Sequence, residues 1–255
     1  MISETPSREV QSVRTAFRIV AAIQERDGAT LKGLAEGLDL AKSTLHNYLR
    51  TLQSMGYVVE RDGAYHLGLR FLTNGMAARN SIDGRDTVTH ALSAVASELS
   101  QPAWWIVEEF GRGIFVAKAV PDGTEEIYGR VGKRSYLHTH APGKAILARM
   151  TDQYREEVVE YHGLPVHTTK TTTDRKALGD ELDRIREQGY AVSDGEAALG
   201  VQSVGVGFDG PAGGPQAVGV FGYSHEFSRN TLERDIPSLL QDAVDEIDAS
   251  LGGGT

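Results

Sequence analysis

The stretch Ala41-Lys42-Ser43-Thr44-Leu45-His46-Asn47-Tyr48-Leu49-Arg50 decides how the first part of this chain folds. Apolar residues recur at helical spacing, which predicts one packed helix face made of Leu45, Tyr48, Leu49, Leu52 and Met55. The opposite face carries the side chains of Ser43, His46, Asn47 and Arg50. One side of this helix can therefore pack while the other presents hydrogen-bonding groups.

The sequence around this helix predicts a winged helix-turn-helix. A first amphipathic helix is expected over 12–26, and Thr30 can cap a second helix that ends near Leu38, which leaves a tight turn before Ala41. Two strand-like runs follow, and they are joined by Asp62-Gly63, a strong hairpin signal because this turn needs positive φ. Residues 1–68 are thus predicted to form one domain.

The rest of the chain predicts a linker helix over 69–83 and a larger sheet domain over 84–255. Strand-like runs at 104–110, 113–120 and 125–131 favour an antiparallel meander, and helical patterns and Gly-rich strands follow them. Strands in succession with helices grouped around them are typical of an α+β fold. The expected class is α+β, with the antiparallel sheet flanked by helices.

Composition limits the kind of protein this can be. The net charge is −9, but residues 1–80 hold 10 Lys and Arg against 8 Asp and Glu, whereas the remainder holds 16 against 27. The first part is therefore +2 and the second −11, so any contact with nucleic acid belongs to the first part. With no cysteine, no leader-like N-terminus and no apolar run long enough for a membrane span, we expect a soluble cytoplasmic protein.

The helix over 41–55 has the residues that DNA-reading helices use near their N-terminal end. Amides and guanidinium groups bond base edges in the major groove, and hydroxyl and basic groups bond phosphates. A wing-tip arginine can enter a minor groove or contact a phosphate. The candidate DNA-binding residues are Lys42, Ser43, Thr44, His46, Asn47, Arg50 and Arg61. The alternatives are an ordinary solvated helix face, or a small-molecule sensor that acts through protein contacts.

Enzyme and cofactor motifs are weak in this chain. The glycines of 205–210 have dinucleotide-binding spacing, but the prolines of 211–215 exclude the helix that such a site needs. Gly143-Lys144 lacks the hydroxyl residue and the earlier glycine of a phosphate loop, and no Gly-x-Ser-x-Gly elbow is present. We therefore expect no catalytic residues and no cofactor.

Two pairs of residues leave alternatives open. His138 and His140 alternate on an extended segment and would suit a metal with a third ligand such as His162, His167 or Asp194, although ordinary hydrogen-bonded histidines are favoured. Trp104 and Trp105 are the only tryptophans, and alternation along a strand points them to opposite faces. Both are expected in the core, with a pocket lining by one as the alternative.

Several motifs in the same order make the chain similar to the IclR family of transcriptional regulators, over most of the length from Ser12 to Leu251. The matching segments are Ala41-Lys42-Ser43-Thr44-Leu45-His46, Tyr65-His66-Leu67-Gly68, Leu137-His138-Thr139-His140-Ala141-Pro142-Gly143-Lys144-Ala145, Gly189-Tyr190 to Glu196, and Gly200-Val201-Gln202-Ser203. The resemblance implies a winged helix that binds operator DNA, a linker helix that helps to dimerise, and a GAF-like domain that binds a small metabolite. It also implies a homodimer or homotetramer without catalytic activity, controlling a carbon-catabolic pathway.

The resemblance also implies an effector site near the helix that follows Thr139. Its expected members are His140, Ala141, Pro142, Gly143, Asp194 and Ser203, with backbone amides at the helix start favouring an anion. Pro142 removes one such amide, and Ser203 stands where relatives commonly have cysteine. These departures predict an effector that is larger or less charged than a short 2-oxo acid.

Overall fold

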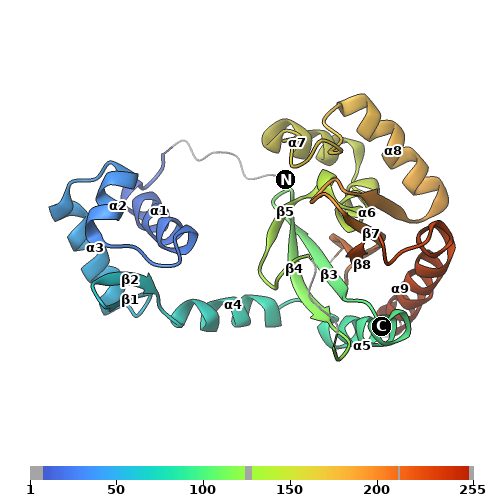
Figure 1. Cartoon of the computed structure of the whole chain (residues 1–255), viewed down its shortest axis with the longest axis horizontal. Helices are drawn as coiled ribbons and strands as arrows, with labels where there is room; N and C mark the ends of the chain where they lie inside the picture. The colour runs from blue at the N-terminus through green and yellow to red at the C-terminus, as the bar shows by residue number, and fades with distance from the viewer. Residues whose placement is uncertain (1–7, 124–127, 212, 253–255) are drawn as a thin grey trace. The chain divides into compact units, whose positions relative to one another are not determined.

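The computed structural model describes residues 8–123, 128–211 and 213–252, and it divides into two compact units at the boundary between Ser81 and Ile82 (Figure 1). Each unit has its own apolar core. Among the helices in these ranges, none has the length and apolar character needed to cross a membrane.

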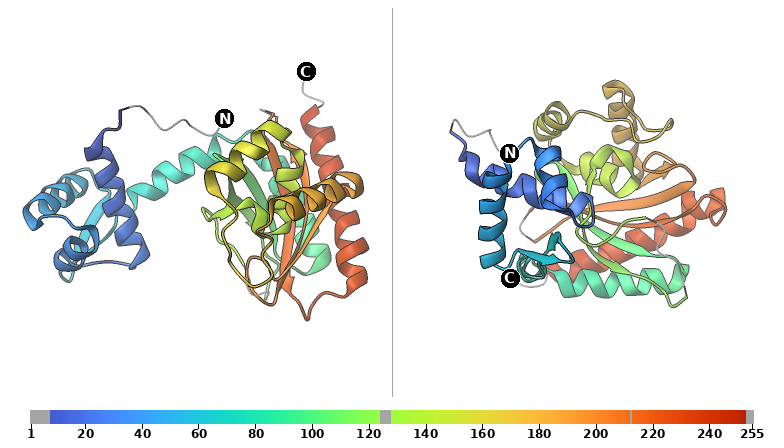
Figure 2. Two further views of the ribbon diagram at one scale, coloured as in Figure 1. Left: turned by 90° about the horizontal axis from the view of Figure 1, so that it is seen from above. Right: turned by 60° about the vertical axis from the view of Figure 1, so that its left-hand side comes forward.

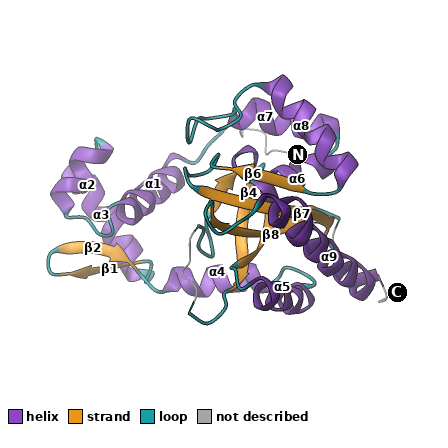
Figure 3. Cartoon of the chain, turned by 45° about the vertical axis from the view of Figure 1, so that its right-hand side comes forward, coloured by secondary structure: helices purple, strands orange, loops and turns teal. Residues whose placement is uncertain are grey.

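The first unit is a three-helix bundle followed by a two-stranded wing and one further helix. Its core consists of side chains from the three helices and the wing, including Ile19, Leu34, Leu45 and Leu49, all of them fully buried. The strands pair antiparallel, and Figure 3 shows them beside the helices. The elements are α1 (Gln11–Glu25), α2 (Leu31–Leu38), α3 (Lys42–Ser54), β1 (Val58–Arg61), β2 (Ala64–Leu67) and α4 (Arg70–Asn80).

Local sequence signals explain where these elements begin and end. The Thr30 hydroxyl accepts a hydrogen bond from the Gly33 amide at 3.2 Å, which caps α2 as predicted. Asp39 adopts a left-handed conformation in the turn between α2 and α3. At the wing tip, Asp62 and Gly63 have φ values of 51° and 75°, so the predicted turn with positive φ is confirmed.

The apolar stripe of α1 divides between two environments. Ile19, Ala22 and Ile23 are buried in the core, whereas Val13 and Phe17 are 54% and 63% exposed. Apolar residues at helical spacing can face the core or remain on the surface, and the spacing is the same in both cases. The sequence alone therefore did not indicate which apolar residues of α1 meet the core. The exposed face remains on the surface of this unit.

The second unit is a six-stranded antiparallel sheet with helices on both faces, which confirms the α+β prediction (Figure 2). The strand order is β5-β4-β3-β8-β7-β6. Helices α5 and α9 pack on one face, and α6 packs against β7 and β8 on the other. The elements are α5 (Arg85–Leu99), β3 (Ala103–Glu109), β4 (Arg112–Ala119), β5 (Arg134–Tyr136), α6 (Ala141–Arg149), α7 (Asp152–His162), α8 (Arg175–Gln188), β6 (Ala191–Asp194), β7 (Val201–Asp209), β8 (Pro215–Tyr223) and α9 (Ile236–Gly252).

The predicted third strand of the meander, over 125–131, is wrong in its described part. Residues 128–131 are not a strand, and residues 125–127 lie outside the described residues. Gly129 and Gly132 have φ values of 97° and 84°, which interrupt an extended conformation. The third strand is instead β5, which pairs with β4 from Arg112↔Tyr136 onward.

The two faces of the sheet form separate apolar clusters, and the adjacent tryptophans of β3 belong to different ones. Trp105 packs with α5 and α9, while Trp104 packs on the α6 side, as strand alternation predicts. The start of α6 lies very close to the sheet at Gly205 and Gly219, because a Cβ on either glycine would come within 2.5 Å of Pro142. Side chains at those strand positions would push α6 away from the sheet.

Candidate functional site

The exposed face of α3 carries the first candidate site. The side chains of Leu45 and Leu49 are fully buried and fix this helix on the core. The predicted DNA-binding residues all lie on the surface: Lys42, Ser43, Thr44, His46, Asn47 and Arg50 on α3, and Arg61 at the end of β1. The structure therefore brings one wing residue and one helix face into the same unit, with polar groups in contact with solvent.

These polar side chains are not engaged within the protein. In the described parts of the chain, none of the seven makes a side-chain hydrogen bond or an ion pair. Arg50 lies close enough to Tyr65 of β2 to act on its hydroxyl electrostatically, which places the guanidinium on the wing side of α3. An unbonded donor or acceptor on a rigid helix is available to an external partner.

A groove of about 780 Å³ lies beside this face, between α1, α3 and α4. Its lining is mainly apolar, and Asn47 stands at its edge next to Tyr48 and Thr51. The residues that line it are Ser12, Val13, Ala16, Phe17, Val20, Asn47, Tyr48, Thr51, Leu52, Met55, Tyr57, Phe71 and Asn74. Sequence analysis grouped several of these as a core stripe and did not predict that they would stay uncovered.

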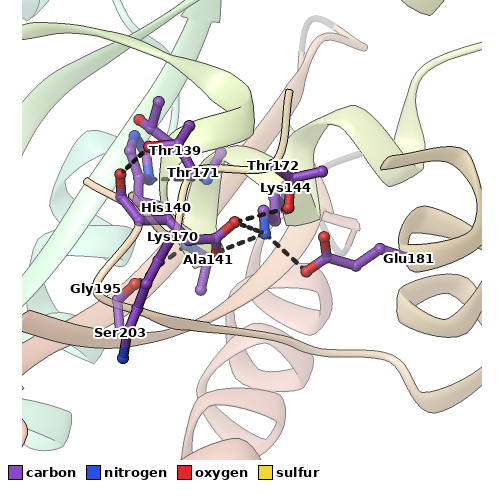
Figure 4. Close-up of polar contacts among 12 residues, drawn as sticks. Thr139, His140, Ala141, Lys144, Lys170, Thr171, Thr172, Glu181, Gly195 and Ser203 are labelled. Carbon is purple, nitrogen blue, oxygen red and sulfur yellow. Dashed lines mark hydrogen bonds and ion pairs between the residues drawn. The ribbon is translucent and has the colours of Figure 1, made fainter. Parts of the chain in front are cut away.

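The second candidate site is the N-terminal end of α6, where the backbone amides already have partners inside the protein. The Ala141 amide donates to the Ser203 hydroxyl at 3.1 Å, and the Gly143 amide donates to Nδ1 of His140 at 3.0 Å. Pro142 has no amide proton. Figure 4 shows Ser203 of β7 beside Ala141. The predicted effector residues around Ala141 therefore lie close together, but their polar groups are hydrogen-bonded to one another and not free for a ligand.

The bonds of His140 define its protonation state. Because Nδ1 accepts from the Gly143 amide, the proton of the neutral ring is on Nε2, which donates to the Ser135 hydroxyl at 2.7 Å. Ser135 in turn donates to the Gly113 carbonyl at 3.1 Å. Burial, with smaller contributions from nearby cationic groups, lowers the pKa of His140 to about 3. Both ring nitrogens are used internally, and the ring faces are its remaining contact surface.

Asp194 is separated from the other predicted effector residues. It pairs with Gln202 across β6 and β7, whereas Ser193 pairs with Ser203, so Asp194 and Ser203 point to opposite faces of the sheet. Its carboxylate forms an ion pair with Lys170 at 2.7 Å and is half exposed. The structure therefore does not place Asp194 beside the start of α6.

Sequence analysis missed the charged centre of this region, Lys144. Its ammonium is 1% exposed and lies 2.6 Å from both carboxylate oxygens of Glu196 and 2.7 Å from Glu181 of α8 (Figure 4). The Thr172 hydroxyl also donates to Glu196. In the sequence, Lys144 was visible as part of a segment that matches the family and by its position after Gly143, but neither signal indicates an ion pair. In the structure it joins α6, α8 and the loop after β6.

Two of the histidines considered as metal ligands, His138 and His162, are bonded to backbone carbonyls. Nε2 of His138 donates to the Pro165 carbonyl at 3.1 Å, and Nε2 of His162 donates to the Phe110 carbonyl at 2.7 Å. Burial lowers the pKa of His138 and of His167, which keeps both rings neutral at physiological pH. Over the described ranges, no three His, Asp or Glu side chains are grouped in a way that could hold a metal ion.

Comparison with known proteins agrees with both units. The model of the IclR helix-turn-helix domain matches residues 12–62, and that of the bacterial transcriptional regulator IclR C-terminal domain matches residues 77–249. The probable HTH-type transcriptional regulator ArcR of Halobacterium salinarum is 31% identical over 252 residues, which cover 96% of this chain and 95% of ArcR.

Solved structures share the fold over nearly the whole chain. An IclR transcriptional regulator from Alicyclobacillus acidocaldarius has a TM-score of 0.79 at 25% identity, covering 95% of this chain and 99% of that one. An IclR homologue from Microbacterium hydrocarbonoxydans, crystallised with 4-hydroxybenzoate, has a TM-score of 0.76 at 20% identity, covering 94% and 100%.

These relatives are named as regulators, which favours DNA binding over a sensor that acts through protein contacts alone. The first matched range contains α3 with its free polar face, and the second contains the helix-flanked sheet. This chain belongs to the IclR family of DNA-binding transcriptional regulators.

Proposed function

We propose that the chain recognises operator DNA through the start of α3 and the wing, and that a small metabolite in the second unit alters this recognition. The observation that carries the proposal is the set of seven exposed, unbonded polar side chains on a helix fixed by fully buried leucines. The first part of the chain has a charge of +2, against −11 for the remainder, which directs DNA to this unit. Such a regulator acts in the cytoplasm, without a cofactor.

The side chains divide by chemistry into positioning and reading groups. Lys42, Ser43 and Thr44 begin α3, where hydroxyl and ammonium groups bond phosphates and set the depth of the helix in the groove. Asn47 and Arg50 lie a turn further on, and their forked side chains match the edges of adenine and guanine. We assign His46 to the same groove and Arg61 to the backbone beside the wing.

The apolar groove between α1, α3 and α4 fits a second copy of the chain. Its large apolar residues form an exposed strip, in which Val13, Phe17 and Met55 are 54%, 63% and 47% exposed. Burial of such a strip in a symmetric interface removes apolar surface from water and presents two recognition helices to a palindromic operator. We therefore propose a homodimer through this groove, on which a homotetramer can be built.

Light scattering of Phe17→Glu tests this interface. A charge at a groove position that is 63% exposed in the single chain should halve the particle mass, whereas Tyr161→Glu, at an equally exposed position on α7, should leave it unchanged. An unchanged mass for Phe17→Glu would place the interface elsewhere.

We place the effector on the sheet face that carries α6. Ser203, Ser135 and the ring of His140 approach one another there, and the IclR homologue with 4-hydroxybenzoate is one relative whose bound ligand is identified. An anion at the α6 amides would first have to replace the Ser203 hydroxyl or the His140 ring. We therefore assign Ala141, Pro142 and Gly143 to the wall of the site, with Asp194 outside it.

Salt dependence of DNA binding tests the proposal as a whole. A DNA sequence enriched from a random pool by the full-length protein should bind with an affinity that falls steeply with salt, with a slope near −0.9 per phosphate contacted. Arg61→Ala should reduce this slope by about 0.9, and Arg229→Ala, an exposed arginine near the start of α9, should not change it. Enrichment of no sequence, or a slope near zero, would contradict operator binding.

A further inference from the structure

Five ring side chains form an aromatic cluster on the sheet face that carries α6. Trp104, Phe115 and Phe221 extend from β3, β4 and β8, His140 stands before α6, and Tyr128 lies in the connection between β4 and β5. Ring centroids are 5.3 Å apart for Trp104 and Phe115, 5.9 Å for Phe115 and Phe221, and 5.0 Å for Tyr128 and Phe221. The cluster therefore brings rings from three strands together, with an edge contact between Trp104 and Phe115 and a stacked contact between Tyr128 and Phe221.

Tyr128 is the least fixed member of the aromatic cluster. The three strand residues are fully buried, whereas Tyr128 is half-buried and belongs to neither a helix nor a strand. Its ring is stacked on Phe221 at an interplanar angle of 27°. The next residue, Gly129, has φ of 97° and lies so close to Phe115 and Trp104 that a Cβ would clash with the Phe115 ring. Tyr128 thus occupies a flat slot that rings of the strands define.

One polar group in the aromatic cluster has no partner. Nε1 of Trp105, on the other face of the sheet, donates to Gln216 at 2.8 Å, whereas Nε1 of the fully buried Trp104 has no acceptor in the described part of the chain. A buried donor without an acceptor destabilises a fold, and an oxygen atom of a ligand in the aromatic cluster would give this donor an acceptor.

A cation at the edge of the aromatic cluster also lacks a counter-ion. Nζ of Lys133 lies 3.1 Å from the ring centroid of Tyr128 and 5.5 Å from that of Phe115, and no described carboxylate forms an ion pair with it. Burial, with help from Arg130, lowers the pKa of Lys133 to about 8. The lysines that act on His140 are Lys133 and Lys144, and both disfavour a further positive charge there. The surroundings therefore favour an anion.

We propose that the aromatic cluster is the effector site and that its ligand is an aromatic carboxylate. The ligand ring takes the place of the Tyr128 ring against Phe221, its carboxylate pairs with the Lys133 ammonium, and the Trp104 indole donates to an oxygen of the same ligand. Ring faces in the lining favour a flat aromatic body over a short 2-oxo acid, which would leave them uncovered. This inference rests on the proposed function, because it identifies the metabolite class that the second unit binds.

Matched ligands test the inference by titration calorimetry on the full-length protein. The probes are benzoate and 4-hydroxybenzoate, with benzamide as a neutral match, cyclohexanecarboxylate as a non-planar match, and pyruvate as a short acid. At least one of the two aromatic acids should bind at least tenfold more tightly than benzamide, cyclohexanecarboxylate and pyruvate. The assignment is wrong if neither aromatic acid binds, or if a neutral, saturated or short probe binds as tightly.

Variants separate the two polar contacts. Lys133→Met should weaken binding of the aromatic acid at least tenfold without changing the affinity for benzamide, and Lys133→Arg should restore part of the loss. Trp104→Phe keeps a ring and removes the donor, so about a tenfold loss is expected. If Lys133→Met and Trp104→Phe both bind the acid like the wild type, the inference fails.

Trp105→Phe is the matched control and also a probe. It removes the tryptophan on the opposite face and should keep wild-type affinity, and it leaves Trp104 as the only fluorescent tryptophan. Addition of the acid should then change the fluorescence of Trp104, and an unchanged spectrum at saturation counts against the site. If the aromatic acids fail while the enriched DNA still binds and another metabolite alters that binding, the proposed function stands and only this inference falls.

Discussion

The exposed start of α3 and the buried start of α6 use similar polar groups in opposite ways. On α3, the predicted DNA-binding side chains are on the surface and have no partner in the described chain, so they are available to a partner outside it. At α6, the ring of His140, the hydroxyl of Ser203 and the ammonium of Lys144 are buried and bonded to one another or to neighbouring elements. The polar groups of the first surface are free, whereas those of the second stabilise its own structure. In our proposals, the first surface binds DNA and the second leaves ring faces for a ligand.

The comparison predicts the largest loss of stability at Lys144. Lys144→Met leaves the carboxylate of Glu196, which is 9% exposed, without its cation, and removal of one partner from a buried pair costs about 3–5 kcal/mol. Urea unfolding of the second unit should show this loss. Lys176→Met, which removes an exposed lysine from α8, should leave the midpoint unchanged.

A double variant tests the same ion pair between Lys144 and Glu196 by removing both of its charges. The double variant Lys144→Met with Glu196→Gln removes the unpaired charge and should recover part of the stability lost in Lys144→Met. A single variant as stable as the wild type would mean that the charges of this buried group do not hold α6 in place.

The second largest expected effect is a loss of folding stability as the pH falls. The pKa of His140 is lowered from 6.5 to about 3, so between these values the unfolded chain binds a proton at this position and the folded chain does not. Stability conferred by the neutral ring is therefore complete above pH 6.5 and is lost as the pH falls. Between pH 6.5 and 5, the wild type should lose about 2 kcal/mol more than His140→Asn in chemical denaturation. Equal losses of stability in the wild type and in His140→Asn would contradict a buried, neutral His140.

A smaller effect is expected at Ser203. Ser203→Ala leaves the buried amide of Ala141 without its acceptor, which should cost about 1 kcal/mol in thermal or chemical unfolding. Ser193→Ala is the matched control, because Ser193 is the buried cross-strand neighbour of Ser203. Equal losses of stability for the two variants would mean that the hydrogen bond from Ala141 to Ser203 does not stabilise the fold.

Much of the first unit could be predicted from the sequence because its signals are local. Thr30 caps α2, Asp62-Gly63 forms the wing turn, and apolar spacing sets the buried face of α3. The exposed face of α1 could not be predicted, because Val13 and Phe17 have the same spacing as core residues. Only the tertiary fold decides which apolar stripe is covered within one chain.

The interior of the second unit was less predictable because its partners come from distant segments. The motif from Leu137 to Ala145 marks the correct place, but the pairing of Lys144 with Glu196 and the bond from Ala141 to Ser203 depend on how α6 lies on the sheet. The strand expected over 125–131 is absent from its described part, residues 128–131, where Gly129 has a positive φ. Asp194 matched the family pattern, yet strand alternation turns it to the opposite face from Ser203.

The most direct test of the account measures how well the protein distinguishes its enriched DNA sequence from random DNA, at fixed salt. In Asn47→Ala combined with Arg50→Ala, this ratio of affinities should fall at least tenfold, because each side chain that reads a base contributes about 1–3 kcal/mol of discrimination. Arg229→Ala, in the other unit, should keep the wild-type ratio. A double variant that distinguishes the two DNAs as well as the wild type would contradict the assignment of the exposed α3 face to operator recognition.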